Sequence, residues 1–258
     1  MGAANIKANK VTISSSLKIN TRPLQDSRFS RDPSTSLHFP PLRSGNGLCR
    51  LSLLDRFGDR NHMKYRNLGS TGLQISEVIF GGGAVGGILI GADDDTRRKA
   101  VRMALDAGIN WIDAAASYGT GASETAIGWL MKEVPESDRP YISTKTAFDQ
   151  TAGDYAGQAE RALTASLEKL QMDRVDLYQV HNRIAGSSDA LEDAITPDDL
   201  LRAGGIADVM RSLVDKDLTR HIGFTSTGEA ESLHKVISSQ RFQSAQVYYK
   251  PVKSVGRA

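Results

Sequence analysis

Residues 154–182 read DYAGQAERALTASLEKLQMDRVDLYQVHN, a helix pattern followed directly by a strand pattern. In the first half, apolar residues recur at steps of four, four and three, on one face of a helix: Ala159, Leu163, Leu167 and Leu170. The run Val175–Val180 is short and mostly apolar, as expected of a strand that is buried on both faces. A helix that leads straight into such a strand is typical of a parallel sheet, so this stretch predicts an α/β fold.

The same alternation continues on both sides of this stretch. Further strand-like runs lie at Val78–Phe80, Trp111–Asp113, Tyr141–Thr144, Ile222–Thr225 and Ala245–Tyr249. Further helical patterns lie at Asp93–Ala107, Ser123–Glu133 and Glu229–Arg241. The segment Thr196–Asp199 (TPDD) indicates another helix start, and two β-like stretches around Gly69–Gly72 predict an N-terminal hairpin. Six strands with helices between them predict a parallel sheet, either open and doubly wound or curved into a (β/α) barrel.

The composition is that of a water-soluble globular protein. The 258 residues are 40% hydrophobic, which suffices for one large core. No apolar run approaches the roughly 20 residues that cross a bilayer. The net charge of +2 gives no reason to expect nucleic acid as a partner. Cys49 is the single cysteine, so we expect neither a disulfide framework nor a cysteine-based metal site, and we predict a cytoplasmic protein.

Residues 1–62 differ in character from the rest of the chain. They hold ten Lys and Arg against four Asp, a net charge of +6. They are rich in Ser, Arg, Asn and Pro, as in DSRFSRDPSTSLHFPPLRSGNG, and show no sustained apolar period. We interpret them as a disordered extension. Two interpretations stay open: a transit peptide for a plastid or mitochondrion, or an appended segment without a role, with Met63 as the natural start.

Polar residues stand at the ends of the predicted strands. The stretch Asn110–Gly119, NWIDAAASYG, places Asp113 at the end of one strand and Tyr118 in the loop that follows. Lys145 ends the next strand and His181 the one after that. Each alone has an ordinary structural interpretation, such as a helix cap or a buried histidine. Because the C-terminal ends of parallel strands meet at one edge, we expect these four side chains to converge on one site.

Together these groups suit acid catalysis at a carbonyl. A phenol ordinarily has a pKa of about 10 and is a weak acid at neutral pH. An ammonium beside it stabilises the phenolate, and a carboxylate keeps that ammonium charged and in place. An imidazole can orient a substrate carbonyl next to the phenol. The set predicts protonation of a carbonyl oxygen as hydride reaches its carbon, with acid catalysis on the order of 100- to 10,000-fold.

The chain from Met63 to about Pro251 resembles the aldo-keto reductase family, in its aldose- or galactose-dehydrogenase-like branch. The matching motifs stand in the family's order: KYRNLGSTGLQISEVIFGGG, DAAASYG, YISTK, SLEKLQMDRVDLYQVHN, HIGFTS and AQVYYKP. The resemblance implies a (β/α)8 TIM-barrel type fold with the hairpin closing its bottom. It also implies an NADP-dependent oxidoreductase that interconverts a small-molecule carbonyl, which is an aldehyde, ketone or aldose, and an alcohol.

The resemblance also assigns residues to roles, none of them in a metal site. It implies a catalytic tetrad, with the phenol as proton donor: Asp113, Tyr118, Lys145 and His181. It implies contacts with the cofactor, chiefly with its nicotinamide carboxamide, at Gly82, Asn182, Thr225, Ser226 and Gln246.

Two short motifs are typical of other nucleotide-binding folds, and their surroundings argue against both. Gly81–Gly86 satisfies G-x-G-x-x-G, but GILIGADDD follows, and acids at the expected helix start would repel phosphate. Tyr141 and Lys145 satisfy the Y-x-x-x-K of short-chain dehydrogenases, which needs a helix to place both on one face. Here the segment follows Pro140 and has a strand pattern. We reject both interpretations.

Beyond the position of Pro251, the family continues through two further βα units, which help to hold the nicotinamide and the adenosine 2′-phosphate. We therefore expect residues 63–258 to form an incomplete barrel, truncated at the C-terminus, with about six of eight βα units and weak NADP binding. The alternative function is a non-catalytic, reductase-like regulatory subunit. These residues do not reveal the substrate, the choice of NADP over NAD, or the oligomeric state. The longest loop after a strand, 183–196, is small and polar.

Overall fold

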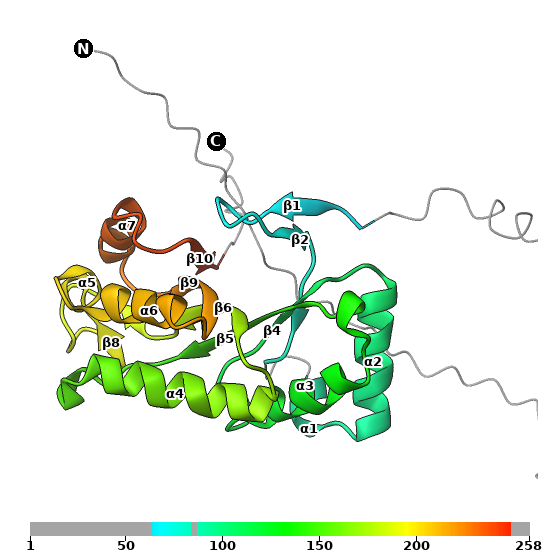
Figure 1. Ribbon diagram of the computed structural model, residues 1–258. Helices are drawn as coiled ribbons and strands as arrows, with labels where there is room; N and C mark the ends of the chain where they lie inside the picture. The colour runs from blue at the N-terminus through cyan, green and yellow to red at the C-terminus, as the bar shows by residue number, and fades with distance from the viewer. Residues whose placement is uncertain (1–62, 84–86, 249–258) are drawn as a thin grey trace, which may run out of the picture. The chain divides into compact units, whose positions relative to one another are not determined.

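The computed structural model describes residues 63–83 and 87–248 (Figure 1). The predicted extension, residues 1–62, lies outside these ranges, as do residues 84–86 of the glycine-rich run and residues 249–258. The described part contains the predicted hairpin followed by alternating strands and helices.

Six parallel strands form the central sheet. In chain order they are β3 (Phe80–Gly81), β4 (Trp111–Asp113), β5 (Tyr141–Thr146), β6 (Val175–Val180), β9 (Thr219–Ser226) and β10 (Ser244–Val247). Their order across the sheet is β10-β9-β6-β5-β4-β3, so each strand lies beside its neighbour in the sequence. A doubly wound sheet reverses its strand order at one point, and this sheet does not. The fold is an incomplete (β/α)8 barrel, the second of the two predicted architectures.

The helices follow one another beside this sheet. The longer ones are α2 (Asp94–Asp106), α3 (Ala122–Lys132), α4 (Tyr155–Leu170), α6 (Ile206–Asp215) and α7 (Ala230–Ser238). Helix α4 contacts α3 on one side and α6 on the other, as in the outer ring of a barrel (Figure 1). The helices begin at capping residues that the sequence offers. Asp93 caps α2, Asp154 caps α4, and Thr196 forms a capping box at α5 (Pro197–Leu201). Three short helical turns complete the set: α1 (Ile88–Gly91), η1 (Glu136–Asp138) and η2 (Gln150–Ala152).

Several boundaries differ from the sequence prediction, and two of the differences have a local cause. Strand β3 begins at Phe80 instead of Val78, because the Ser76 hydroxyl donates to the Val78 carbonyl and the chain bends before the strand. The helix predicted to start at Thr196 is two helices, since the glycines 204–205 separate α5 from α6. A side chain at Gly205 would collide with backbone, so this break requires a glycine.

The loop after β6 contains two short strands that the sequence did not reveal. Strands β7 (Arg183–Ile184) and β8 (Ala194–Ile195) pair in parallel, with Arg183 opposite Ala194. The side-chain amide of Gln150 also donates to the Ala194 carbonyl at 3.0 Å. The segment that we interpreted as a small polar loop is thus fastened at both ends.

The predicted hairpin consists of β1 (Tyr65–Asn67) and β2 (Gln74–Ser76), which pair antiparallel. Its apolar side chains form a separate core cluster with residues of the sheet: Leu68, Leu73, Ile75, Trp111 and Leu177. Because Trp111 and the adjoining Tyr141 are the first residues of β4 and β5, the hairpin packs at the N-terminal end of these strands. The C-terminal ends lie at the opposite end of the sheet.

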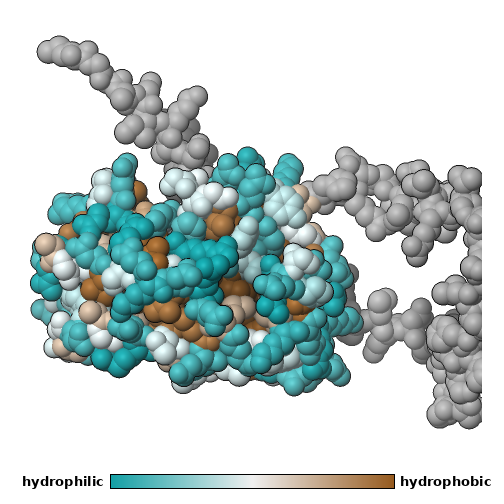
Figure 2. Space-filling model, viewed as in Figure 1, coloured by the Kyte–Doolittle hydropathy of each residue, from teal (hydrophilic) through white to brown (hydrophobic). Residues whose placement is uncertain are grey.

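The main core lies between the sheet and the helices. The apolar stripe predicted for α4 is fully buried there: Ala159, Leu163, Leu167 and Leu170. Burial of a large aliphatic side chain contributes about 1.5–3 kcal/mol, so this stripe fixes α4 firmly against the sheet. On the face shown in Figure 2, hydrophilic residues cover most of the surface and hydrophobic ones show between them.

Candidate active site

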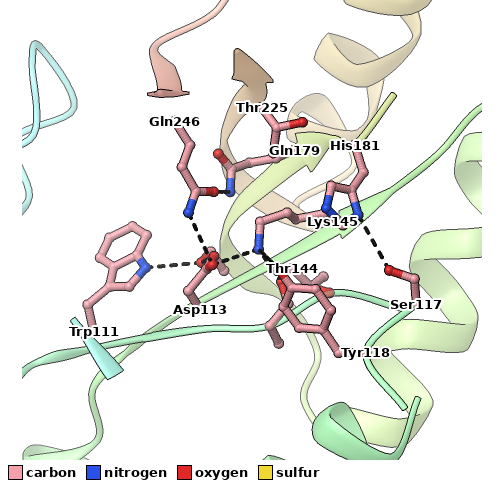
Figure 3. Close-up of polar contacts among 12 residues, drawn as sticks. Trp111, Asp113, Ser117, Tyr118, Thr144, Lys145, Gln179, His181, Thr225 and Gln246 are labelled. Atoms are coloured by element: carbon pink, nitrogen blue, oxygen red, sulfur yellow. Dashed lines mark hydrogen bonds and ion pairs between the residues drawn. The ribbon is translucent and has the colours of Figure 1, made fainter. Parts of the chain in front are cut away.

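A buried lysine and aspartate form the centre of the site. Asp113 ends β4, and Lys145 lies on the adjacent strand β5 with only 1% of its surface exposed. Its Nζ lies 2.7 Å from Asp113 Oδ2, 2.7 Å from the Ala114 carbonyl oxygen and 3.4 Å from the Tyr118 hydroxyl (Figure 3). An ammonium has three donors, so each donor of Lys145 has an acceptor. This pairing offsets the large cost of burying the charge.

The Asp113 carboxylate is itself held in place by side chains of two other strands, β5 and β10. Its Oδ1 accepts a 2.6 Å hydrogen bond from Ser143, which pairs with Asp113 in the register of β4 and β5. Its Oδ2 accepts a 3.3 Å bond from the Gln246 amide on β10. Trp111 donates to the Ser143 hydroxyl at 3.0 Å and completes the chain of contacts. The carboxylate orientation is therefore fixed independently of Lys145.

Tyr118 reaches the lysine from the loop between β4 and α3. The loop extends the pairing of β4 with β5, since the amide of Ala116 donates to the Lys145 carbonyl at 3.1 Å. Gly119, the residue after Tyr118, has a positive φ of 60°. A side chain there would lie 2.6 Å from a carbon of Ile90. The five-residue spacing from Asp113 to Tyr118 thus fits a tight loop that brings the phenol back over the strand end.

His181 follows β6 and lies beside the phenol. The two rings meet edge to face, with 5.8 Å between centroids and an interplanar angle of 81°. The Ser117 hydroxyl lies 3.5 Å from His181 Nδ1. Burial lowers the pKa of His181 below its usual 6.5, and the positive charge of Lys145 lowers it further, against a weaker opposing effect of Asp113. The imidazole is therefore neutral at pH 7.

Three of the residues predicted to hold the nicotinamide lie at the C-terminal ends of β9 and β10. Gln246 pairs with Thr225 in the strand register, and Ser226 is the next residue of β9. The Gln246 amide has two long bonds of 3.3 Å, one to Asp113 and one from the side chain of Gln179. The Thr225 hydroxyl donates to the Val180 carbonyl at 3.2 Å.

The other two predicted cofactor residues have close structural contacts. The Gly82 amide donates to the Asp113 carbonyl at 2.8 Å, and a Cβ on this glycine would lie 2.5 Å from the Ser123 hydroxyl. The buried Asn182 amide bonds both backbone groups of Phe148, at 2.7 and 2.9 Å, and the carbonyl of Asp193 at 3.0 Å. Asn182 thus fastens the loop after β6 to the loop after β5.

Two polar residues of this network were missed by the sequence analysis, Ser143 and Gln179. Ser143 precedes Lys145 by two positions on β5, and Gln179 of β6 precedes His181, the residue just after that strand, by two positions. Residues two apart share a face of a strand. A polar side chain on the face that carries Lys145 or His181 was therefore a usable signal. In the described part of the chain, we find no cluster of His, Cys, Asp and Glu that could hold a metal. None of the described helices is long and apolar enough to cross a membrane.

The sequence profile of the aldo/keto reductase family matches residues 77–257. The chain belongs to the aldo/keto reductase family. Among curated relatives, it is 35% identical to the aldo-keto reductase YhdN of Bacillus subtilis over 170 residues, 64% of this chain and 47% of that protein. It is 31% identical to L-galactose dehydrogenase of Arabidopsis thaliana over 166 residues, 63% of this chain and 48% of that protein.

A solved aldo-keto reductase structure is similar to part of this chain. The holo form of aldo-keto reductase AKR11C1 from Bacillus halodurans is 25% identical with a TM-score of 0.56, over 73% of this chain and 58% of that one. This aldo/keto reductase chain spans about half the length of the curated relatives it matches. The partial coverage agrees with a sheet of six strands where the complete barrel has eight.

Proposed function

We propose that this chain carries the catalytic tetrad of an NADP(H)-dependent oxidoreductase that interconverts a carbonyl and an alcohol, with Tyr118 as the proton donor. The observation that carries the proposal is the contact of one buried ammonium, that of Lys145, with both the Asp113 carboxylate and the Tyr118 hydroxyl. Membership of the aldo/keto reductase family supports the reaction type and the cofactor.

The tetrad side chains have complementary tasks in the reductive direction. When bound, the cofactor supplies hydride to the substrate carbon. The Tyr118 hydroxyl donates its proton to the carbonyl oxygen, and Lys145, 3.4 Å away, stabilises the negative charge left on the phenol oxygen. Asp113 holds the ammonium in place through their 2.7 Å ion pair. Neutral His181, edge-on to the phenol, donates a hydrogen bond that orients the carbonyl oxygen beside Tyr118.

The groups at the ends of β9 and β10 fit the nicotinamide end of the cofactor. A carboxamide needs both donors and acceptors, and hydroxyl and amide side chains offer both. The bonds of the Gln246 amide are long, 3.3 Å each, so it can exchange them for shorter bonds to a ligand. We assign Thr225, Ser226 and Gln246 to the carboxamide. Gly82 and Asn182 shape the adjoining loops.

The Tyr118→Phe variant tests the proton donor. It keeps the ring that packs against His181 and loses the hydroxyl, so the fold and the NADPH affinity are expected to stay unchanged. We expect kcat/KM for NADPH-dependent reduction of 4-nitrobenzaldehyde to fall at least ~100-fold, which is the low end of acid catalysis. The matched control is Tyr65→Phe in the hairpin, which is expected to keep full activity. Activity in Tyr118→Phe within threefold of the parent would contradict the assignment.

We further propose that the 258-residue chain by itself binds NADPH weakly and turns over slowly. Its coverage of about half of the curated relatives supports this. In the described sheet, β3 and β10 each have a partner on one side. Micromolar NADPH affinity in a fluorescence titration would contradict the proposal that this chain binds NADPH weakly. The non-catalytic regulatory subunit is less well supported, because the four tetrad side chains are all in contact.

A further inference from the structure

The hydroxyl of Ser117 is a polar group beside the tetrad that the proposed mechanism does not use. It follows three alanines, Ala114–Ala116, and directly precedes Tyr118. Its oxygen lies 3.5 Å from Nδ1 of His181 (Figure 3), and among the described residues neither side chain makes another hydrogen bond. Both residues line a cleft of about 360 Å³ beside Lys145. The contact therefore occupies one of the two ring nitrogens of His181 and leaves Nε2 for a ligand.

The backbone fixes the positions of these two residues. Next to Ser117, the Ala116 amide donates to the Lys145 carbonyl at 3.1 Å. The His181 amide donates to the Thr146 carbonyl at 2.7 Å. Lys145 and Thr146 are consecutive residues at the end of β5. One strand end thus supports both partners, and this shared support brings the serine and the imidazole together.

The contact bears on which nitrogen of His181 carries the ring hydrogen. Burial lowers the pKa of His181, and the charge of Lys145 lowers it further, so the ring is neutral at pH 7 and has a single N–H. If Nδ1 carried the hydrogen, it would donate to Ser117, and Nε2 could only accept. If the Ser117 hydroxyl donates to Nδ1, the hydrogen is on Nε2, which can then donate to a substrate carbonyl.

The second arrangement also makes the stronger hydrogen bond. An imidazole nitrogen is a stronger base than a hydroxyl oxygen and is therefore the better acceptor, and the serine hydroxyl can rotate its hydrogen toward it. The 3.5 Å distance is long, as catalytic hydrogen bonds often are before the substrate binds. A half-turn of the ring would replace Nδ1 with a carbon and lose the bond, so the same contact also favours one ring orientation.

We propose that Ser117 is a positioning residue, whose hydroxyl donates to Nδ1 of His181 and holds the ring in the tautomer with its hydrogen on Nε2. This inference rests on the proposed function, because this tautomer is the one that can donate to the carbonyl beside Tyr118. It assigns a task to the single residue between the alanines and the tyrosine in the motif DAAASYG.

NMR of the 258-residue chain, labelled in its histidine ring nitrogens and measured at pH 7.5 without cofactor or substrate, tests this inference. The signals of His181 are identified by their loss in His181→Gln. Ser117→Ala removes the hydroxyl, whereas Ser117→Thr keeps a hydroxyl at the same position. Ser137→Ala, at an exposed serine of η1, is the matched control.

In the parent chain, Nε2 of His181 is expected to resonate as a protonated nitrogen and Nδ1 as an unprotonated one. In Ser117→Ala, the ratio of this tautomer to the other is expected to fall about fivefold, which is the effect of one ordinary hydrogen bond. Ser117→Thr and Ser137→Ala should keep the parent's ratio. The signals of His221 should stay the same in every variant, because the fold is unchanged.

A hydrogen on Nδ1 of His181 in the parent chain, or an unchanged tautomer ratio in Ser117→Ala, would overturn the inference. The spectra require no hydride transfer. Such a result therefore differs from a failure of the Tyr118-dependent reduction of 4-nitrobenzaldehyde, which would count against the proposed function.

Discussion

Lys145 is the residue on which the geometry of this site depends. A lysine in a buried strand is costly unless its charge and its donors are all paired. Here Asp113, Ala114 and Tyr118 supply one acceptor each, from a strand end and the loop that follows it. The contacts that offset the cost of burying the Lys145 ammonium also place its charge beside the Tyr118 phenol. Stability and proposed chemistry therefore depend on one side chain.

The Lys145→Met variant is expected to lower both the stability of the fold and the proposed reductase activity. Loss of the ammonium leaves the Asp113 carboxylate buried without its partner, so the free energy of unfolding should fall by about 3–5 kcal/mol. In urea unfolding, the double variant Asp113→Asn/Lys145→Met is expected to recover most of that loss, because no unpaired charge remains. Reduction of 4-nitrobenzaldehyde should stay at least ~100-fold down in both variants. A double variant that regained activity would show that the charge is dispensable for chemistry.

At single positions, the sequence indicated candidate site residues but not their contacts. Asp113, Lys145 and His181 stand out because each is polar and directly ends an apolar run, and the parallel fold brings strand ends together. Their catalytic roles stay predictions. Sequence could not show that Asn182 bonds the loop backbone, since a buried amide and a ligand-binding amide look alike in sequence.

At the scale of elements, one buried contact joins α3 to β5 next to Lys145. Glu124 lies in the first turn of α3 with no exposed surface, and accepts a 2.6 Å bond from Thr144 on β5. Lys169 of α4 lies 3.8 Å from its second carboxylate oxygen. Since Thr144 precedes Lys145 and α3 follows the Tyr118 loop, this contact sets the distance between the two elements that carry the amine and the phenol.

Thr144→Val removes the donor to Glu124 while keeping the shape of the side chain. A buried acceptor left without a partner costs about 1–3 kcal/mol, so the free energy of unfolding should fall by about 2 kcal/mol. Thr164→Val, at an exposed position of α4, is the control and should change it by less than about 0.5 kcal/mol. Urea unfolding followed by circular dichroism measures both. Equal stability of the two variants would mean that water or another group satisfies Glu124.

Element boundaries could be predicted where side chains act locally. The caps Asp93, Asp154 and Thr196 start helices through bonds within three residues of themselves, so their signal is contained in the sequence. The pairing of β7 with β8 joins residues eleven positions apart and depends on Gln150 from another loop. Such contacts have no local pattern, and the sequence analysis missed β7 and β8 for this reason.

For the whole molecule, alternation of strands and helices predicted a parallel sheet but did not decide between its two forms. The residues of a buried strand are apolar in either form, because both bury the strand on two faces. The two forms differ in which strands are neighbours in the sheet. In this sheet Lys145 of β5 pairs with Gln179 of β6, and Gln179 pairs with Gly223 of β9. Family motifs supplied that order where residue patterns could not.

The stability of the whole molecule is expected to fall as the pH falls through about 6.5. Burial lowers the pKa of His181 and that of His221 below 6.5 in the folded state. Below that pH, the unfolded chain binds protons on both imidazoles that the folded chain does not yet bind, so protonation favours unfolding. The urea midpoint should therefore be lower at pH 5.5 than at pH 7.5.

Two histidine variants separate this effect from general acid sensitivity. His181→Gln removes one of the two responsible groups, so its urea midpoint should change less between pH 7.5 and 5.5 than that of the parent. His234→Gln, at an exposed position of α7, should keep the parent's full pH dependence. Identical slopes for the parent and His181→Gln would mean that His181 is as easily protonated in the folded chain as in the unfolded one. The neutral imidazole that we propose beside Tyr118 would then be lost near pH 6.5.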